Sequence, residues 1–223
     1  MKKIIVFTFA LYSLAIFSQS VNLGDANFGG SHSVGRLLQD QWFSEAFDVK
    51  IEDVKGSPYL NKEFLPSKVK GRDDSHLMRY NMFHDNIEFF QDEKIMVLPK
   101  EEAYSEVTFL KENRKFRLID GKYYIVLFDG KSISALKKMS VKFQKMQKST
   151  NGYQSDIPAK FINLDDQYFI FRDNKLENTP KNAKDFVELF PEKKNDLLKF
   201  IKEKKLKLNT DSGITDAVKF TEK

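Results

Sequence analysis

Two Asp-Gly pairs, Asp120-Gly121 and Asp129-Gly130, lie nine residues apart, and strand-forming residues flank each of them. An Asp-Gly pair between two apolar runs is the strongest short-range signal for a β-hairpin, because both residues tolerate the positive φ angles of a tight turn. Residues 116–131 and the run that follows are therefore predicted to form a three-strand meander. Residues 123–128 are apolar on both strand faces, so this middle strand is expected at the centre of its sheet.

Short alternating runs continue on both sides of this meander, from about residue 64 to residue 176. Asp85-Asn86 is expected to close a two-residue hairpin turn between the runs around Tyr80 and Ile87. Asp165-Asp166 is expected to close the last hairpin, between Phe161 and the run 168–171. About ten short strands without long crossover helices predict an antiparallel sheet.

The apolar period becomes helical after Thr179-Pro180, a favourable helix start. Three short amphipathic helices are expected from apolar residues spaced three and four apart, namely Phe186, Leu189 and Phe190, then Leu197, Leu198 and Ile201, then Ile214, Ala217 and Val218. The predicted fold class is mainly β (α+β): an antiparallel β-meander, built as a sandwich or an open barrel and followed by short C-terminal helices.

The first twenty residues have the layout of a secretory signal peptide. Lys2 and Lys3 precede the apolar run 4–17, and small residues at Ser18 and Ser20 offer cleavage after either one. The alternative is a membrane anchor, but a bilayer core of about 30 Å needs about 20 apolar residues, and the run is shorter. The expected location is therefore outside the cytoplasm: the periplasm, the outer-membrane surface or the exterior.

Four segments are expected along the chain: a signal peptide at 1–20, a flexible N-terminal leader at 21–50, an antiparallel β domain at 51–178, and a helical region at 179–223 packed on it. The leader is rich in Gly, Asn and Ser up to residue 35, and an apolar cluster containing Trp42 and Phe43 follows. The periodicity of that cluster does not distinguish a helix from irregular packing.

The chain contains no cysteine. This excludes disulfides, thiolate metal sites, iron–sulfur clusters, cysteine nucleophiles and the cysteine-linked lipid anchor of bacterial lipoproteins. An exported chain of this kind must be held together by its core alone. Without Lys2 and Lys3, 35 basic and 32 acidic residues leave a net charge of only +3.

Several motifs resemble one group of proteins. They are the run 56–64, Gly-Ser-Pro-Tyr-Leu-Asn-Lys-Glu-Phe; the runs Met78-Arg79-Tyr80-Asn81 and Asp85-Asn86-Ile87-Glu88-Phe89; and the helix start Phe190-Pro191-Glu192-Lys193-Lys194. Together they resemble an uncharacterised family of secreted, β-rich proteins of Bacteroidota. The resemblance implies export and a β-rich body, and it implies no reaction, cofactor or catalytic residue.

No catalytic, cofactor-binding or metal-binding residue is predicted. His32, His76 and His84 are isolated in the sequence and lack the spacing of metal ligands, although folding could bring His76 and His84 close to Asp73 or Asp74. The neighbouring carboxylates at Asp73-Asp74, Glu101-Glu102 and Asp165-Asp166 are expected in solvated turns, since catalytic carboxyl pairs face each other across a cleft.

Basic residues concentrate in the segment 192–208, where seven lysines face three acidic residues and give a local charge of +4. These lysines form the candidate interaction surface: Lys193, Lys194, Lys199, Lys202, Lys204, Lys205 and Lys207. A basic amphipathic helix can bind an envelope protein or an anionic envelope surface. The competing interpretation is a solvated helix face with Leu197, Leu198 and Ile201 packed inward. Nucleic acid is disfavoured because the segment lacks arginine and stacking aromatics.

The strand aromatics could either fill a core or line a groove for a sugar or lipid, and the core is favoured. These aromatics are Tyr123, Tyr124, Phe128, Tyr168 and Phe171. The sequence therefore predicts an exported, non-catalytic binding or structural protein of the cell envelope. The alternative is a secreted hydrolase whose carboxylates converge only in the fold, and a deep pocket containing two carboxylates would favour it.

Overall fold

The structure is a computed structural model that describes residues 43–47, 49–91, 94–149 and 155–222. The expected signal peptide and the leader up to residue 42 lie outside these ranges. In chain order the strands are β1 (Leu65–Val69), β2 (His76–Asn81), β3 (Asn86–Gln91), β4 (Lys94–Val97), β5 (Glu106–Phe109), β6 (Arg114–Ile119), β7 (Lys122–Asp129), β8 (Ile133–Lys138), β9 (Val141–Gln144), β10 (Lys160–Asn163), β11 (Gln167–Arg172) and β12 (Lys175–Asn178).

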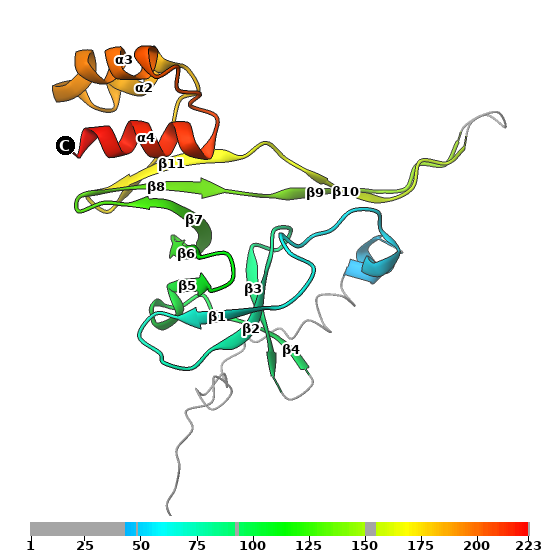
Figure 1. Cartoon of the computed structure of the whole chain (residues 1–223). Helices are drawn as coiled ribbons and strands as arrows, with labels where there is room; N and C mark the ends of the chain where they lie inside the picture. Colours follow the sequence, from blue (N-terminus) through cyan, green and yellow to red (C-terminus); the bar gives the residue numbers. More distant parts are fainter. Residues whose placement is uncertain (1–42, 48, 92–93, 150–154, 223) are drawn as a thin grey trace, which may run out of the picture.

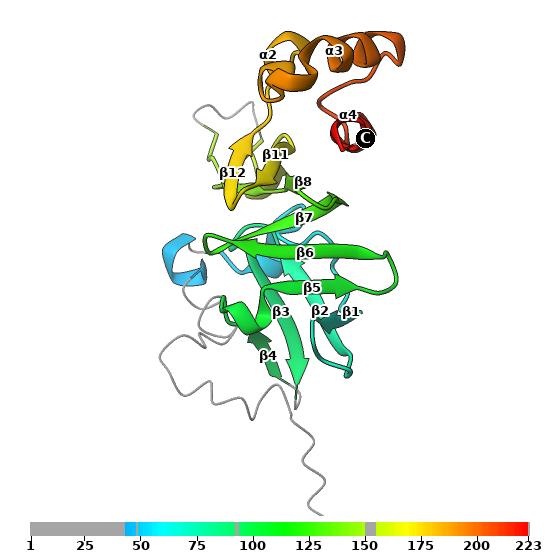
Figure 2. The ribbon, with the colours of Figure 1, turned by 90° about the vertical axis from the view of Figure 1, so that its left-hand side faces the viewer.

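Three α-helices follow the strands: α2 (Ala183–Glu188), α3 (Lys194–Glu203) and α4 (Asp211–Thr221). Three short 3-10 helices are η1 (Ile51–Asp53), η2 (Glu102–Tyr104) and η3 (Pro191–Lys193), and residues 43–47 are also helical. Figures 1 and 2 show the helices grouped on one side of the strands, above β8 and β11. The mainly antiparallel β class with short C-terminal helices is confirmed.

Ten strands form one antiparallel sheet in the order β12-β11-β8-β7-β6-β5-β1-β2-β3-β4, and β9 pairs with β10 separately. The sheet is not closed into a barrel, since its two end strands are β12 and β4. The meander β6-β7-β8 is confirmed. Its first turn is Asp120-Gly121, with φ angles of 49° and 71°, and Ile119 pairs with Lys122 around it. Asp129 belongs to β7 and pairs with Ser134, so the second connection is residues 130–132.

The β2–β3 hairpin is present, but its turn differs from the prediction. Asn81 pairs with Asn86, so the loop is residues 82–85 and Asn86 belongs to the strand. The Asn81 side-chain oxygen accepts hydrogen bonds from the backbone N–H groups of Phe83 and His84, at 3.1 and 3.0 Å. These bonds stabilise a four-residue loop in place of a two-residue turn.

The hairpin expected around Asp165-Asp166 is wrong. β10 pairs with β9, whereas β11 pairs with β8 and β12. The last hairpin is β11–β12, which turns at Asp173-Asn174 with φ angles of 47° and 58°. The reason is that β10 pairs with β9 and β11 pairs with β8, so residues 164–166 connect β10 to β11 without reversing the chain.

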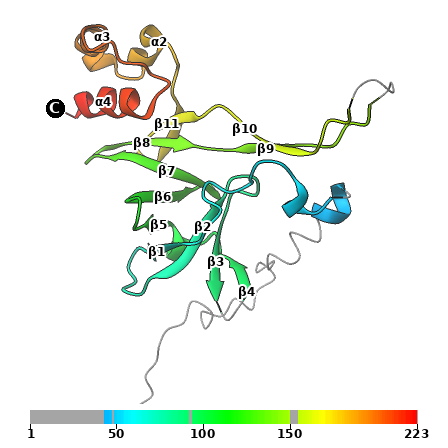
Figure 3. The ribbon, with the colours of Figure 1, turned by 45° about the vertical axis from the view of Figure 1, so that its right-hand side comes forward.

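The outer part of this ribbon, residues 141–149 and 155–163, is called the distal ribbon below. It contains the β9–β10 pair and, beyond it, an antiparallel bridge between Gln147 and Ile157. Figures 1 and 3 show it extending away from the rest of the molecule, on the side opposite the helices. Residues 150–154, between the two halves of the distal ribbon, lie outside the described chain.

Two large apolar cores stabilise the fold. The first lies against β1–β3 and β5–β7 and includes Met78, Phe89 and Phe116. Phe43 is completely buried in it, so the end of the segment expected to be a flexible leader is part of the core. The second core lies between β8, β11 and the three helices. β7 is buried on both faces, with Tyr123 and Tyr124 exposed by only 1% and 5%, as its sequence predicted.

The helical periods are confirmed by burial. The buried helical residues are Phe186, Val187, Leu197, Ile201, Ile214, Ala217 and Val218. The cap of α2 is Asn182, whose side-chain oxygen accepts from the Asp185 N–H at 2.9 Å, and α2 therefore starts after the predicted Thr179-Pro180. α4 contacts β7 and β8, which attaches the helical region to the sheet.

Candidate functional site

Six large apolar side chains are more than 40% exposed in the described chain, and they fall into two groups of three. Leu77, Phe90 and Leu110 belong to the ten-stranded sheet, whereas Met146, Ile157 and Leu164 belong to the long ribbon. Scattered exposed apolar residues are normal on a soluble protein, but grouped ones indicate an interaction surface. Both groups are therefore candidate sites.

The first group forms a row across the outer face of the sheet. Pro66 pairs with Leu77, and Phe90 pairs with Ile95, while the β2–β3 register places Leu77 beside Phe90. The N–H of Leu110 donates to the Pro66 carbonyl at 2.9 Å, which extends the row to the end of β5. Immediate neighbours in sequence, such as Met78 and Phe89, point to the core, because successive strand residues alternate between faces.

The second group lies on a part of the chain that has few neighbours. Met146 is 54% exposed and Ile157 is 46% exposed; Ile157 pairs with Gln147 in the antiparallel bridge, and Met146 directly precedes Gln147. Leu164 lies at the inner end of the distal ribbon, where its N–H donates to the Ser140 carbonyl at 3.0 Å. An extended two-stranded ribbon cannot bury side chains on both of its faces without a partner.

The distal ribbon is also basic. Lys142, Lys145 and Lys148 are exposed and Lys160 is half-buried, whereas Asp156 is the only acidic residue in the described part of the ribbon. Its net charge is therefore +3, four positive charges against one negative. The Asp156 carboxylate accepts a hydrogen bond from the Ser149 N–H at 2.8 Å, so it is directed toward the ribbon's own backbone.

The inner end of the distal ribbon is anchored in the first core. The ring of Phe143 lies 4.9 Å from that of Phe43 and 5.5 Å from that of Phe161. The Phe161 N–H donates to the Lys55 carbonyl at 2.8 Å. Gly56 has a φ of 88°, and a Cβ there would lie 2.8 Å from the Phe161 carbonyl oxygen, so only glycine permits this close approach. The ribbon is held firmly at one end and exposed at the other.

The lysines predicted as an interaction surface begin with Lys193 at the end of η3 and continue through α3 and the segment after it, at the opposite end of the molecule (Figure 1). Three of them have partners: Lys193 donates to the Thr221 carbonyl at 2.8 Å, Lys194 lies 2.6 Å from Glu188, and Lys199 lies 3.9 Å from Glu203. The others, Lys202, Lys204, Lys205 and Lys207, are exposed. The inward packing of Leu197 and Ile201 is confirmed, while binding by these lysines stays a prediction.

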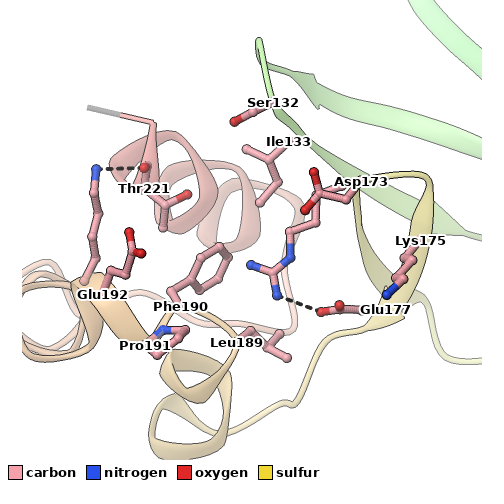
Figure 4. A pocket seen from close by; sticks show the side chains of 12 residues that line it. Ser132, Ile133, Asp173, Lys175, Glu177, Leu189, Phe190, Pro191, Glu192 and Thr221 are labelled. Atoms are coloured by element: carbon pink, nitrogen blue, oxygen red, sulfur yellow. Dashed lines mark hydrogen bonds and ion pairs between the residues drawn. The ribbon is translucent and has the colours of Figure 1, made fainter.

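An open groove of about 600 Å³ lies between the β11–β12 turn and the helices (Figure 4). Its apolar part includes Ile133, Leu189, Phe190 and Pro191, and its charged part includes Arg172, Asp173, Lys175, Glu177, Glu192 and Lys193. Arg172 binds Glu177 at 3.0 Å and lies 5.3 Å from the centre of the Phe190 ring. Asp173 and Glu192 are exposed, so these carboxylates do not form the enclosed pair that a hydrolase needs.

The residues considered for catalysis are separated in the fold. His76 binds Asp74 at 2.6 Å, whereas His84 lies in the loop at the other end of β2, where burial lowers its pKa. Asp166 binds Lys137 at 3.0 Å, and Asp165 is exposed. Among the residues that the structure describes, no group of three or more acidic or histidine side chains could hold a metal ion.

Two buried polar clusters were not predicted from the sequence. Arg79 and Glu88 form an ion pair on the outer face of the sheet at 2.7 Å. Lys138 contacts Asp85 and donates to the Tyr80 hydroxyl at 3.2 Å; burial lowers the pKa of Lys138 and raises that of Tyr80. The first pair depends on the four-residue loop 82–85, which places Arg79 opposite Glu88, whereas the predicted two-residue turn would not have placed them opposite each other. The second joins positions 53 residues apart and gives no local signal.

The aromatics considered for a groove are distributed over three apolar clusters. Tyr123 lies in the first core, Tyr168 in the second, and Tyr124 in a smaller cluster on the outer face of β7 and β8. The favoured interpretation, burial in a core, is confirmed for these three residues, which are all less than 7% exposed.

Comparisons with protein-family models, with curated proteins and with solved structures find no match to this chain. The resemblance to secreted Bacteroidota proteins therefore stays a prediction. None of the described helices is long and apolar enough to cross a membrane.

Proposed function

We propose that the protein is an exported, non-catalytic interaction protein of the bacterial envelope, and that the distal ribbon is the element that contacts its partner. The observation that carries the proposal is the combination of exposed apolar and basic side chains on a ribbon that extends beyond both cores. A polar, uncharged surface would suffice if the ribbon only had to remain in water.

The sequence supports export through the basic start and the apolar run of residues 4–17. The fold supports a binding role because it gives the ribbon a rigid base, through the packing of Phe143 and Phe161 on Phe43. Rigid presentation lowers the entropy that a binding element loses when it meets its partner. The carboxylates of the groove in Figure 4, by contrast, are exposed or paired with Arg172.

The absence of cysteine allows a direct test in the native cell, because one introduced cysteine becomes the only thiol of the chain. Met146→Cys places it on the distal ribbon, and Lys207→Cys places it on the predicted lysine surface. Both positions are exposed, so neither variant should disturb folding. Each protein is labelled in the cells with a thiol-specific photocrosslinker, which reacts with proteins and lipids alike.

Met146→Cys is expected to give crosslinked products in the envelope fraction, and Lys207→Cys is expected to give none. Equal products from the two positions, or products from Lys207→Cys alone, would contradict the role of the ribbon. Recovery of the protein in the cytosol with Met1 intact would contradict export, and with it the envelope function.

A further inference from the structure

We infer that the distal ribbon binds an anionic lipid surface, with its lysines contacting the headgroups and its apolar side chains entering the interface. This inference rests on the proposed function, and it names the partner that the ribbon's charge and shape fit best.

The charge of the ribbon complements an anionic surface. Lys142, Lys145 and Lys148 are exposed residues along one side of the ribbon's length, and the Lys145 ammonium lies 5.1 Å from the centre of the Phe47 ring. Lys142 and Lys148 share one face of the ribbon, where both can approach headgroups. Each basic side chain near an anionic bilayer strengthens binding about fivefold, if the usual contribution of about 1 kcal/mol is converted into an affinity ratio. Among the described residues of the ribbon, Asp156 has the only carboxylate, and it accepts a hydrogen bond from the Ser149 N–H.

The apolar side chains distinguish a lipid surface from a purely ionic partner. Met146 is 54% exposed and Ile157 is 46% exposed, and both lie farther out than the β9–β10 pair. The positions directly opposite Met146 and Gln147 are Pro158 and Ile157, so the two large apolar residues lie on opposite faces of the ribbon. A ribbon with apolar side chains on both faces can enter the headgroup layer so that both faces contact lipid. A partner protein with a flat surface would contact only one of the two faces.

The shape of the molecule permits this contact. Figures 1 and 3 show the ribbon extending past the body, so lipid can reach it without displacing the core or the helices. Helix α3 lies at the other end of the molecule in Figure 1, away from the distal ribbon. Binding by the ribbon and binding by the α3 lysines are therefore separable by mutation.

The test uses protein purified from its own cells, so that its N-terminus is the natural one, and measures co-sedimentation with phosphatidylglycerol and with phosphatidylcholine vesicles. The ribbon variant replaces Lys142, Lys145 and Lys148 with glutamine. The matched control replaces Lys202, Lys204 and Lys207 with glutamine, which removes the same charge from equally exposed positions. Thermal unfolding of each variant checks that the fold is retained.

Wild-type protein is expected to bind phosphatidylglycerol vesicles and to bind phosphatidylcholine weakly. The ribbon variant should bind phosphatidylglycerol at least about tenfold less tightly, while the α3 control should bind like wild type. A second variant, Met146→Ser with Ile157→Ser, should lose the part of the binding that survives high salt, because salt screens the ionic part. Loss of binding in the α3 control, or unchanged binding in the ribbon variant, would overturn the inference.

The two proposals fail in different ways. If the wild-type protein does not bind phosphatidylglycerol vesicles but Met146→Cys crosslinks to an envelope protein in cells, the lipid inference is wrong and the proposed function stands. If the wild-type protein does not bind phosphatidylglycerol vesicles and Met146→Cys gives no crosslinked products in cells, the lipid inference and the proposed function are both wrong.

Discussion

Arg79 and Glu88 face each other on β2 and β3, and both side chains are almost completely buried. The Nε and Nη2 atoms of Arg79 donate to one carboxylate oxygen of Glu88 at 2.8 and 2.7 Å, and Asn81 donates to the other at 3.0 Å. The guanidinium also lies 3.7 Å from the ring centre of Tyr59. Arg79 is the only cation that the described structure places against the Glu88 carboxylate.

Arg79→Leu is therefore expected to lower the free energy of unfolding by about 3–5 kcal/mol, because it leaves the Glu88 carboxylate buried without its cation. Chemical denaturation measures the loss. The matched control is Arg114→Leu, which breaks a half-exposed pair with Glu112 and should cost at most about 1 kcal/mol. Equal losses in the two variants would contradict a special role for burial.

Asp129 is a second residue whose charge contributes to stability. Burial raises the pKa of its carboxyl group, but hydrogen bonds from Arg117, Ser134 and Lys115 outweigh this and lower the pKa to about 2. Since the pKa is depressed in the folded state, the stabilisation is complete above the ordinary value of 3.8 and is lost as the pH falls through this range toward 2.

Asp129→Asn should lower the free energy of unfolding at neutral pH by about 1 kcal/mol, a modest value because the carboxylate is partly exposed. The difference from wild type should shrink between about pH 4 and pH 2, where the wild-type carboxylate becomes protonated. Urea unfolding at several pH values tests this. Asp173→Asn, in an exposed turn, is the control and should show no such convergence; a pH-independent difference for Asp129→Asn would refute the linkage.

At the scale of single elements, the Asp120-Gly121 turn and the pairing within the β6-β7-β8 meander were predictable, whereas the other turn positions and the partners of β10 and β11 were not. Asp120-Gly121 gave the correct turn because the required positive φ angles are a property of those two residues. The turn predicted at Asp165-Asp166 was wrong because an aspartate pair is also compatible with a connection between two strands that do not pair with each other, and only the pairings of β10 with β9 and of β11 with β8 show this. The three helices were predicted correctly because the apolar period of each helix is contained in a segment of about ten residues.

Gly121→Ala tests the turn directly. A Cβ at this position would meet no atom within 4 Å, so the expected loss of about 1–2 kcal/mol comes only from the φ of 71°. Asp120→Asn, at a φ of 49°, should change stability by less than about 0.5 kcal/mol because asparagine tolerates this conformation. If the alanine variant were as stable as wild type in thermal unfolding, the turn conformation would be wrong.

At the scale of the whole molecule, the open sheet has one buried face and one face with an exposed apolar row. Phe89 is 1% exposed in the first core, and its neighbour Phe90 is 43% exposed in the row. Phe89→Ala should cost about 3–5 kcal/mol, since it leaves a cavity in the core. Phe90→Ala should cost about 1 kcal/mol, since roughly half of its surface is already in water.

Denaturant unfolding of the two phenylalanine variants measures their losses in the free energy of unfolding and so distinguishes the buried face from the exposed face. A larger loss for Phe90→Ala than for Phe89→Ala would mean that the apolar row is covered. The same comparison bears on register, because a shift of one residue between β2 and β3 would exchange the two faces. These stability measurements therefore test the register and the buried face of the sheet, and they do not require the binding partner to be known.

Local patterns were enough to predict the antiparallel β class, the central position of residues 123–128, the three helices and the positions of the charged segments. Turn chemistry and periodicity act between residues a few positions apart, so a single sequence contains them completely. The burial of Phe43, the Asp85–Lys138 contact and the departure of β9–β10 from the main sheet depend on residues far apart in the chain. Those features follow from packing and strand pairing across the whole fold, and they are what place Met146 and Ile157 on an exposed basic ribbon.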